Sequence, residues 1–476
     1  MASATAQEQK VLKIKFGTDG WRAIIAQEYT VDNVARVAEG TAQWILANSD
    51  NHSVVIGHDC RFAGELFAET TARVMCAYGI KVKLAKGFVS TPMVSLGANF
   101  YQTPLGVIIT ASHNPPSYNG YKLKSQAGGP ASPAVIQEVE DMVPDTITVS
   151  LKPFQYYMEQ GQVEYVDLEA LYIDRVKAAF DLDTINHSDK ILAYDAMFGA
   201  GQNVIKKLLP KAMLLHCDYN PGFNGRAPEP LHRNLQELSD LIRSNPQIAA
   251  GLATDGDADR IGMYDENGNF VDSHHILLLL IHYLHKYKGM NGKVVVAFSV
   301  SNKIKKMCEL YGLEHQVTKI GFKYISEIMV KEDVLVGGEE SGGIAVKGHI
   351  PERDGIWDGL ILLEYMAKAG KSMTQLVQEV YDVVGPFAYD RNDLHITEEL
   401  KQAILQKCQA GAYTAFGNNA IQRLEDIDGY KYYLGEDETI MIRASGTEPV
   451  LRVYAEAPTR DRVNELLEAA KATLLA

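Results

Sequence analysis

Short apolar runs alternate with longer amphipathic stretches along this 476-residue chain. The short runs are rich in Val, Ile and Leu, as buried strands are, whereas the longer ones repeat apolar residues three or four positions apart, as helices do. The pattern predicts strands at 54–56, 106–110, 191–194, 248–253, 294–298 and 334–336, and helices at 31–47, 67–78, 167–180, 235–244, 275–287, 357–369 and 460–475. Such alternation predicts an α/β fold built from βα units.

The chain is longer than one hydrophobic core usually supports, so we expect several domains. Three of the predicted strands are each followed by a short loop that carries reactive side chains. These loops begin near Ser112, Asp255 and Glu339. Ligands of open α/β sheets gather at the carboxyl ends of strands, so these loops are candidates for one shared site. Linker-like stretches at 144–166, 265–273 and 385–396 indicate four domains, at 11–160, 161–272, 273–385 and 386–476.

Composition narrows the class of protein. The net charge of −14 argues against non-specific binding of nucleic acid or anionic lipid, although it does not exclude a small phosphorylated substrate. The five cysteines are scattered, which suits reduced thiols. Residues 1–10 contain no apolar signal segment, and the run Ile276–Ile281 is too short to span a bilayer. We expect a cytoplasmic protein without a membrane partner.

Three aspartates, Asp255, Asp257 and Asp259, alternate just after a predicted strand. In an extended segment their side chains would point the same way and repel one another unless a cation held them. Oxygen ligands of this kind suit Mg²⁺. A calcium EF-hand would place Glu266 at loop position twelve, but Arg260 stands at position six, where glycine is required. A solvated acidic turn is the other alternative.

Four stretches, in this order, resemble the motifs of the α-D-phosphohexomutases, which move a phosphoryl group between the 1- and 6-positions of a hexose. They are 110–115 with 119–122, then 255–260, 338–342 and 443–449. The resemblance spans nearly the whole chain. It implies three related α/β domains and a smaller C-terminal α+β domain around a central active-site cleft. In chain order these would be a phosphoserine domain, a metal-binding domain, a sugar-binding domain and a phosphate-binding domain.

Ser112 matches the serine that carries the phosphoryl group in this family. Read alone, it is a turn serine in a Ser-His-Asn-Pro loop. Nucleophilic catalysis with His113 is disfavoured, because adjacent side chains on an extended loop diverge. Phosphorylation would add about −1.5 to −2 charges. The resemblance therefore implies that phosphorylated Ser112 completes a Mg²⁺ site with the three aspartates, and that His113 contacts the substrate.

Four basic residues are assigned catalytic roles by the same resemblance. Lys122 is a candidate general acid or base, and Lys323 is a second one or a phosphate contact. Arg22 and Arg260 fit the neutralisation of phosphoryl charge. As an isolated residue, Lys122 would be taken for a solvated surface charge.

The sugar specificity is read from the loops near 320 and 340. Glu339 and Ser341 match sugar-binding residues, although a Gly-rich turn with an exposed Glu pair is the plainer interpretation. The phosphomannomutase/phosphoglucomutase branch often has histidine where this chain has Phe322 and Gly343. Both departures favour the glucose-type enzymes.

A phosphate-binding loop is predicted near the C-terminus. Its residues are Arg443, Ser445, Gly446 and Thr447, with Arg452 beyond them. An arginine side chain can donate two parallel hydrogen bonds to a phosphate, and backbone N–H groups can donate to the remaining phosphate oxygens. The chain has no G-x-x-x-x-G-K-[ST] motif, so a P-loop kinase is not supported.

The prediction is a phosphoglucomutase that interconverts glucose 1-phosphate and glucose 6-phosphate. Its cofactors would be one Mg²⁺, phosphorylated Ser112 and a hexose 1,6-bisphosphate as activator or product, and its partners small hexose phosphates. A glucose 1,6-bisphosphate synthase that uses fructose 1,6-bisphosphate as donor would employ the same residues, and a phosphomannomutase is a lesser alternative. A non-catalytic sugar-phosphate sensor would be expected to lack the serine or an aspartate, and all are present.

Overall fold

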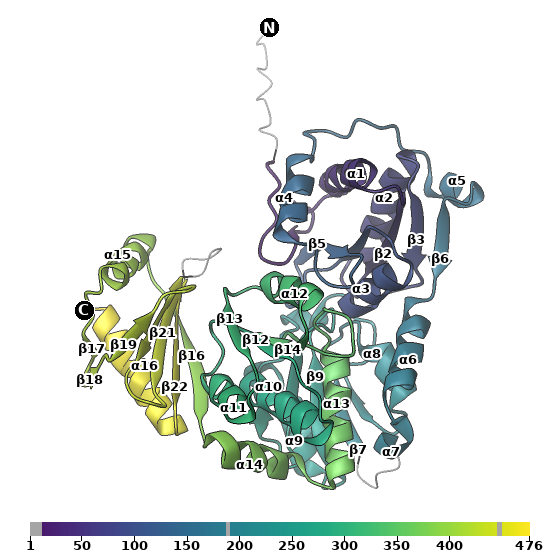
Figure 1. Cartoon of the computed structure of the whole chain (residues 1–476). Coiled ribbons are helices and arrows are strands. Elements are labelled where there is room, and N and C mark those ends of the chain that lie inside the picture. Colours follow the sequence, from purple (N-terminus) through teal and green to yellow (C-terminus); the bar gives the residue numbers. More distant parts are fainter. Residues whose placement is uncertain (1–11, 187–190, 445–449) are drawn as a thin grey trace. The chain divides into compact units, whose positions relative to one another are not determined.

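The computed structural model describes residues 12–186, 191–444 and 450–476. Its backbone forms two compact units: the first is the chain through Val271 with Met329–Lys331 and Gly343–Gly370, and the second is Asp272–Ile328, Glu332–Gly342 and Lys371–Ala476. Both units combine helices with strands (Figure 1). Within the described ranges, no helix is both long and apolar enough to cross a membrane.

The first unit begins with a six-stranded sheet in the order β1-β5-β4-β2-β3-β6. Its strands are β1 (Trp21–Ile24), β2 (Ser53–His58), β3 (Lys81–Ala85), β4 (Leu105–Ile109), β5 (Tyr118–Ser125) and β6 (Val163–Val166). Strands β2, β3, β4 and β6 are parallel, and β5 runs antiparallel between β4 and β1. The four central residues of β2 are all buried, as expected for a parallel strand covered on both faces.

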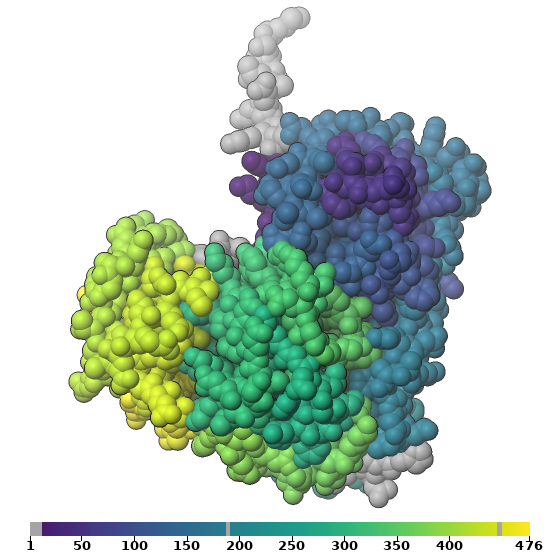
Figure 2. Space-filling model, viewed as in Figure 1, coloured from purple at the N-terminus to yellow at the C-terminus, as the bar shows by residue number. Residues whose placement is uncertain are grey.

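Helices pack on both faces of this sheet, and Figure 2 draws the surface of this part of the chain in purple and blue. They are α1 (Val31–Asn48), α2 (Gly64–Ala77), α3 (Thr91–Phe100), α4 (Pro133–Asp141), α5 (Phe154–Glu159) and α6 (Leu168–Ala179). Helices α1 and α2 pack together, and their Val34 and Phe67 share a core with Val54 and Ile56 of β2. Helix α3 packs on β2, β4 and β5.

A second sheet of the first unit has the order β11-β10-β9-β7-β8. Its strands are β7 (Ile191–Asp195), β8 (Met213–Leu215), β9 (Ile248–Thr254), β10 (Ile261–Tyr264) and β11 (Phe270–Val271). The remaining elements of this part are α7 (Leu182–Asn186), α8 (Gln202–Leu208), α9 (Gln236–Ser244), β15 (Ile344–Val346) and α13 (Gly355–Ala369). Helix α9 packs on β7 and β9, and α13 packs on β9 and β10.

The second unit starts with the parallel strands β13 (His315–Thr318), β12 (Lys293–Ala297) and β14 (Val334–Gly338), in that order. Its helices here are α10 (Ser273–His282), α11 (Lys303–Tyr311), α12 (Phe322–Lys331) and α14 (Met373–Val384). Every residue of the apolar run Ile276–Ile281 is fully buried in α10, which confirms a core helix at this position.

The C-terminal part of the second unit is an antiparallel sheet in the order β16-β22-β21-β20-β19. Its strands are β16 (Ala388–His395), β19 (Arg423–Glu425), β20 (Tyr430–Tyr433), β21 (Thr439–Ala444) and β22 (Val450–Ala457). A hairpin of β17 (Ala415–Phe416) and β18 (Asn419–Ala420) and the helices α15 (Glu398–Gln409) and α16 (Arg460–Leu474) complete it. Helix α16 packs on β16 and β22.

Every strand and helix predicted from the apolar pattern lies on an observed element, with ends displaced by a few residues at most. The linker-like stretches contain regular secondary structure. The stretch 144–166 contains α5 and β6, and 385–396 contains β16. Both strands are only partly buried, so their residues lack the apolar pattern by which buried strands are recognised.

Candidate active site

Two of the three reactive loops lie in the first unit, and each follows a parallel strand. The loop of Ser112 begins after β4, and the loop of Asp255 begins after β9. The third, with Glu339, follows β14 in the second unit. The expected placement of these residues at carboxyl ends of strands is confirmed.

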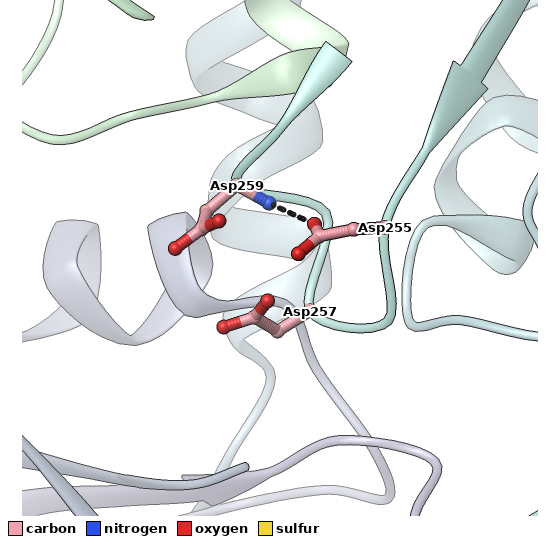
Figure 3. A group of neighbouring side chains, drawn as sticks. All are labelled: Asp255, Asp257 and Asp259. Carbon is pink, nitrogen blue, oxygen red and sulfur yellow. Dashed lines mark hydrogen bonds between the residues drawn. The ribbon is translucent and has the colours of Figure 1, made fainter. Parts of the chain in front are cut away.

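The three aspartates after β9 surround one point (Figure 3). Each offers one carboxylate oxygen, and these atoms lie within 4.8 Å of one another. The extended backbone predicted here is wrong, because the segment turns. Ala258 has a φ of 57°, and its N–H donates to the Asp255 carbonyl oxygen at 3.1 Å. The N–H of Asp259 donates to Asp255 Oδ1 at 3.0 Å, which fixes the turn.

The residues of this loop fit a divalent cation. All three carboxylates are fully buried, and Oδ1 of Asp257 and of Asp259 have no hydrogen-bond partner among the described residues. Burial and the neighbouring carboxylates raise the pKa of Asp255 well above its usual value. Buried carboxylate oxygens without donors are costly unless a cation compensates them, and three hard oxygens suit Mg²⁺.

Ser112 lies directly against the aspartate loop. Its hydroxyl donates to Asp255 Oδ2 at 2.8 Å, and its side chain is fully buried. Its φ of 52° is in the left-handed region, a conformation that non-glycine residues adopt mostly where the surroundings impose it. A Cβ on Gly256 would lie 2.5 Å from the Ser112 carbonyl oxygen, so the two loops approach this closely only with glycine there.

His113 does not diverge from Ser112. Its Nδ1 lies 3.3 Å from Ser112 Oγ, because the left-handed backbone at Ser112 turns the two side chains toward each other. Burial and the charges of Arg260 and Arg22 lower the pKa of His113 well below its usual value. The imidazole is therefore neutral next to the serine hydroxyl.

Lys122 reaches the same place from β5, where it pairs with Ile108 of the neighbouring strand. Its ammonium group contacts Oδ2 of three carboxylates: Asp19 at 2.7 Å, Asp257 at 2.8 Å and Asp259 at 3.4 Å. Burial would lower the pKa of Lys122, but these carboxylates outweigh it and raise the pKa above its usual value. Lys122 is thus a buried, permanently charged cation in contact with two of the aspartates.

The two predicted arginines also lie at these loops. Arg22 Nη1 donates to Asn114 Oδ1 at 2.7 Å, beside the Ser112 loop. Arg260 donates its backbone N–H to Asp255 Oδ1 at 3.2 Å, and its guanidinium lies 3.8 Å from Glu229. The structure therefore brings Arg22 and Arg260 together with Ser112 and the aspartates.

Arg61 was not predicted, and it holds the Ser112 loop in shape. The side chain is buried, and its Nη2 donates to the carbonyl oxygens of Ser112 and Asn114, both at 2.7 Å. Its Nη1 donates to two further carbonyls of the same loop, at Pro115 and Tyr118. The signal that could have found Arg61 is its position just beyond the carboxyl end of β2.

Thr91 and Asp19 are two further polar contacts that the sequence did not single out. The Thr91 hydroxyl donates to Asp257 Oδ2 at 2.5 Å. Asp19 contacts Lys122 and also Arg22, whose Nη2 donates to Asp19 Oδ2 at 3.2 Å. Burial opposes ionisation of Asp19, but the surrounding cations lower its pKa well below the usual value. Asp19 therefore stays ionised.

The predicted sugar-binding residues belong to the second unit. Glu339 is buried, and its Oε1 accepts a hydrogen bond from the Gly321 N–H at 2.9 Å. Lys323 lies in the first turn of α12, two residues after Gly321, and Ser341 is half-buried. The loops at 320 and 340 are thus joined locally through Glu339.

The predicted phosphate loop is described only in part. Ser445, Gly446 and Thr447 lie outside the described residues. Arg443 and Arg452 are directly opposite each other on β21 and β22. Their charged groups lie 3.7 Å from Asp428 and 3.9 Å from Asp393, too far for hydrogen bonds.

Four family models match consecutive parts of the chain. They describe phosphoglucomutase/phosphomannomutase α/β/α domains I, II and III, at residues 13–148, 170–268 and 272–384, and the C-terminal domain of the same family at 399–472. A crystal structure of a protein from Thermus thermophilus, assigned as a phosphomannomutase, is 32% identical, covers 98% of this chain and 100% of its own, and has a TM-score of 0.86. The chain belongs to the phosphoglucomutase/phosphomannomutase family.

Membership of this family makes the chain a phosphohexomutase, an enzyme of the intramolecular phosphotransferase class. Relatives within the family carry different names. A phosphoglucomutase/phosphomannomutase of Thermococcus kodakarensis is 27% identical over 95% of this chain and 96% of its own length. A phosphoglucosamine mutase of Carboxydothermus hydrogenoformans is 29% identical over 95% of this chain and 97% of its own. The sugar is therefore not fixed by these relatives.

Proposed function

We propose that this phosphohexomutase is a phosphoglucomutase, which interconverts glucose 1-phosphate and glucose 6-phosphate through phosphorylated Ser112 and a hexose 1,6-bisphosphate. The observation that carries the proposal is the hydrogen bond from the Ser112 hydroxyl to Asp255, at 2.8 Å. In the same aspartate loop, Asp257 and Asp259 each have a buried oxygen with no hydrogen-bond partner in the described part of the chain. A serine in that position can receive and return a phosphoryl group next to a cation.

The chain's own residues supply most of what phosphoryl transfer needs. The bond between Ser112 Oγ and phosphorus breaks while a sugar hydroxyl oxygen bonds the phosphorus, and the proton of that hydroxyl ends on Ser112 Oγ, which regenerates the free serine. Lys122 stays charged and so counters the charge on the transferring group, as do Arg22 and Arg260. Asp255, Asp257 and Asp259, with an oxygen of phosphorylated Ser112, would hold Mg²⁺, which would draw charge from the phosphoryl oxygens when bound.

The non-reacting end of the substrate is assigned to the second unit. Arg443 and Arg452 are cross-strand partners, so their side chains leave the same face of the sheet, and two guanidinium groups on one face support a phosphate site. Glu339 and Ser341 would bond the sugar hydroxyls, and Lys323 would contact the phosphate or move a proton. The loop residues Ser445, Gly446 and Thr447 would complete the phosphate site.

Glucose is proposed as the sugar because this chain has Phe322 and Gly343 where the phosphomannomutase/phosphoglucomutase branch often has histidine. Phosphoglucosamine mutase is a second candidate, because several relatives bear that name. The test is kcat/KM for glucose 1-phosphate, glucosamine 1-phosphate and mannose 1-phosphate under identical conditions. We expect glucose 1-phosphate to lead by at least about tenfold, a difference of about 1.4 kcal/mol in transition-state binding. A lead for either competitor would replace glucose as the substrate.

Metal removal gives a prediction that does not depend on turnover. After treatment with a chelator, addition of Mg²⁺ should raise the melting temperature by a few degrees, because a ligand at about 100 times its dissociation constant stabilises by about 2.7 kcal/mol. Asp257→Asn should abolish most of this shift. The exposed Asp145→Asn is the control and should keep it. An equal shift in all three proteins would mean that the aspartate loop is not the metal site.

A further inference from the structure

Three consecutive charged residues between β15 and α13 are buried: Glu352, Arg353 and Asp354. Glu352 accepts a hydrogen bond from Lys124 at 2.8 Å. Asp354 caps α13 and accepts hydrogen bonds from the Tyr172 hydroxyl at 2.9 Å. Residues on both sides of Arg353 are therefore anchored, which restricts where its side chain can go.

Arg353 points into the cluster around the aspartate loop. Its Nη2 lies 2.6 Å from Asp259 Oδ2 and 2.9 Å from Asp19 Oδ2. Lys122 contacts the same two oxygens, at 3.4 Å and 2.7 Å. Two buried cations thus contact the same two carboxylates, the buried Asp259 and the partly exposed Asp19, so that each carboxylate is held from two sides.

The arrangement separates the two oxygens of Asp259. Its Oδ2 is bound by Arg353 and Lys122, whereas its Oδ1 has no hydrogen-bond partner among the described residues. Asp257 shows the same separation, with Thr91 and Lys122 on Oδ2 and none of the described residues on Oδ1. Fixing one oxygen of a carboxylate orients the other, which is what outer contacts do for metal ligands.

Gly343 is what leaves room for Arg353. A Cβ at this position would lie 2.4 Å from Arg353 Cδ, closer than side-chain atoms can approach. The φ of Gly343 is outside the left-handed region, so its backbone would accept alanine. Space, and not conformation, therefore requires glycine here. A larger residue at this position, such as a histidine, would displace the Arg353 side chain from this place.

Resting on the proposed function, we propose that Arg353 is a positioning residue of the phosphoryl-transfer site, and that the missing side chain at Gly343 gives its guanidinium this place. Arg353 acts through Asp259: by holding Oδ2, it sets the direction of Oδ1. Gly343 and Arg353 therefore form a functional pair, although Gly343 itself contributes no chemical group.

The first test replaces Arg353 and measures metal binding without substrate. We expect Arg353→Met to weaken the binding of Mn²⁺, followed by electron paramagnetic resonance, by about 10- to 100-fold, the usual effect of removing an outer contact of a metal ligand. Arg353→Lys should recover part of this affinity, because lysine restores the positive charge but not the planar guanidinium with its paired N–H donors. A purely structural ion pair would lower the melting temperature of Arg353→Met and leave its Mn²⁺ affinity unchanged, and that result would overturn the proposal.

The second test is a double-mutant cycle with Gly343→Ala. Alone, Gly343→Ala should lower kcat by about 10- to 100-fold, because it displaces the guanidinium. In an Arg353→Met background, Gly343→Ala should lower kcat little further, since the guanidinium that the new Cβ would displace is already absent. Full additivity of the two losses would show that Gly343 and Arg353 act separately and would contradict the pairing.

Matched controls separate these effects from general damage. Gly435→Ala introduces a Cβ into open space, and Arg36→Met removes a buried arginine that bonds Pro144 and Leu12 carbonyl oxygens. Both should keep wild-type kcat and Mn²⁺ affinity. If the unmodified enzyme turned over none of the hexose phosphates, the proposed function would fail, while the Mn²⁺ measurements would still decide the role of Arg353.

Discussion

Ser112→Ala should lower kcat/KM for glucose 1-phosphate by about 10⁴-fold or more, because it removes the atom that carries the phosphoryl group. The fold should survive. Alanine keeps the Cβ and therefore meets the same backbone strain at a φ of 52°. The side-chain hydrogen bonds lost are those of Ser112 Oγ with Asp255 Oδ2 and with His113 Nδ1. The measurement is a steady-state assay with melting temperatures recorded for both proteins.

Ser125→Ala is the control, because Ser125 lies at the end of β5 and bonds only the local Gly129 carbonyl oxygen with its hydroxyl. It should keep wild-type activity. Residual activity of Ser112→Ala within tenfold of wild type would mean that phosphate transfer does not pass through this serine. Unchanged binding of glucose 1-phosphate with lost turnover is the expected signature of a chemical role.

Lys122→Met should lower kcat by about 10²- to 10⁴-fold and also destabilise the protein by about 3–5 kcal/mol. The first effect follows because Lys122 is the charged group in contact with both Asp257 and Asp259. The second follows because Asp19 and the aspartates would remain buried with less compensation. Added Mg²⁺ should stabilise Lys122→Met more than it stabilises the wild type, since it supplies part of the missing charge.

Lys303→Met is the matched comparison, because Lys303 is equally buried and pairs with a carboxylate, Asp437, that belongs to none of the reactive loops. It should cost similar stability but lose far less activity. Chemical denaturation and kcat, measured for both variants, separate the two roles. If the two variants lost equal activity, the effect of Lys122 would be one of folding alone.

Much of the fold was predictable because buried elements leave a strong pattern. The central strands of the parallel sheets and the long helices were found from their apolar periodicity, as for β2 and α1. The antiparallel C-terminal sheet was not found. Its edge strand β16, Ala388–His395, is partly exposed along most of its length, so polar and apolar residues alternate without a clear run.

The site was predictable where one short motif carries several reactive groups, as around Asp255. The sequence did not predict how the groups meet. The aspartates converge through a turn with Ala258 in the left-handed region, which no residue type there signals. Arg61 and Arg353 were missed because each acts on a loop that is distant in sequence, Arg61 on the loop after β4 and Arg353 on the loop after β9.

The most direct test of the central claim is a phosphorus NMR time course with glucose 1-phosphate, Mg²⁺ and a small amount of fructose 1,6-bisphosphate as phosphoryl donor. A mutase that retains its intermediate should convert most of the sugar to glucose 6-phosphate, far beyond the amount of donor added. Glucose 1,6-bisphosphate that accumulates in step with donor consumption would contradict the mutase and show that the intermediate leaves the enzyme, as in a bisphosphate synthase.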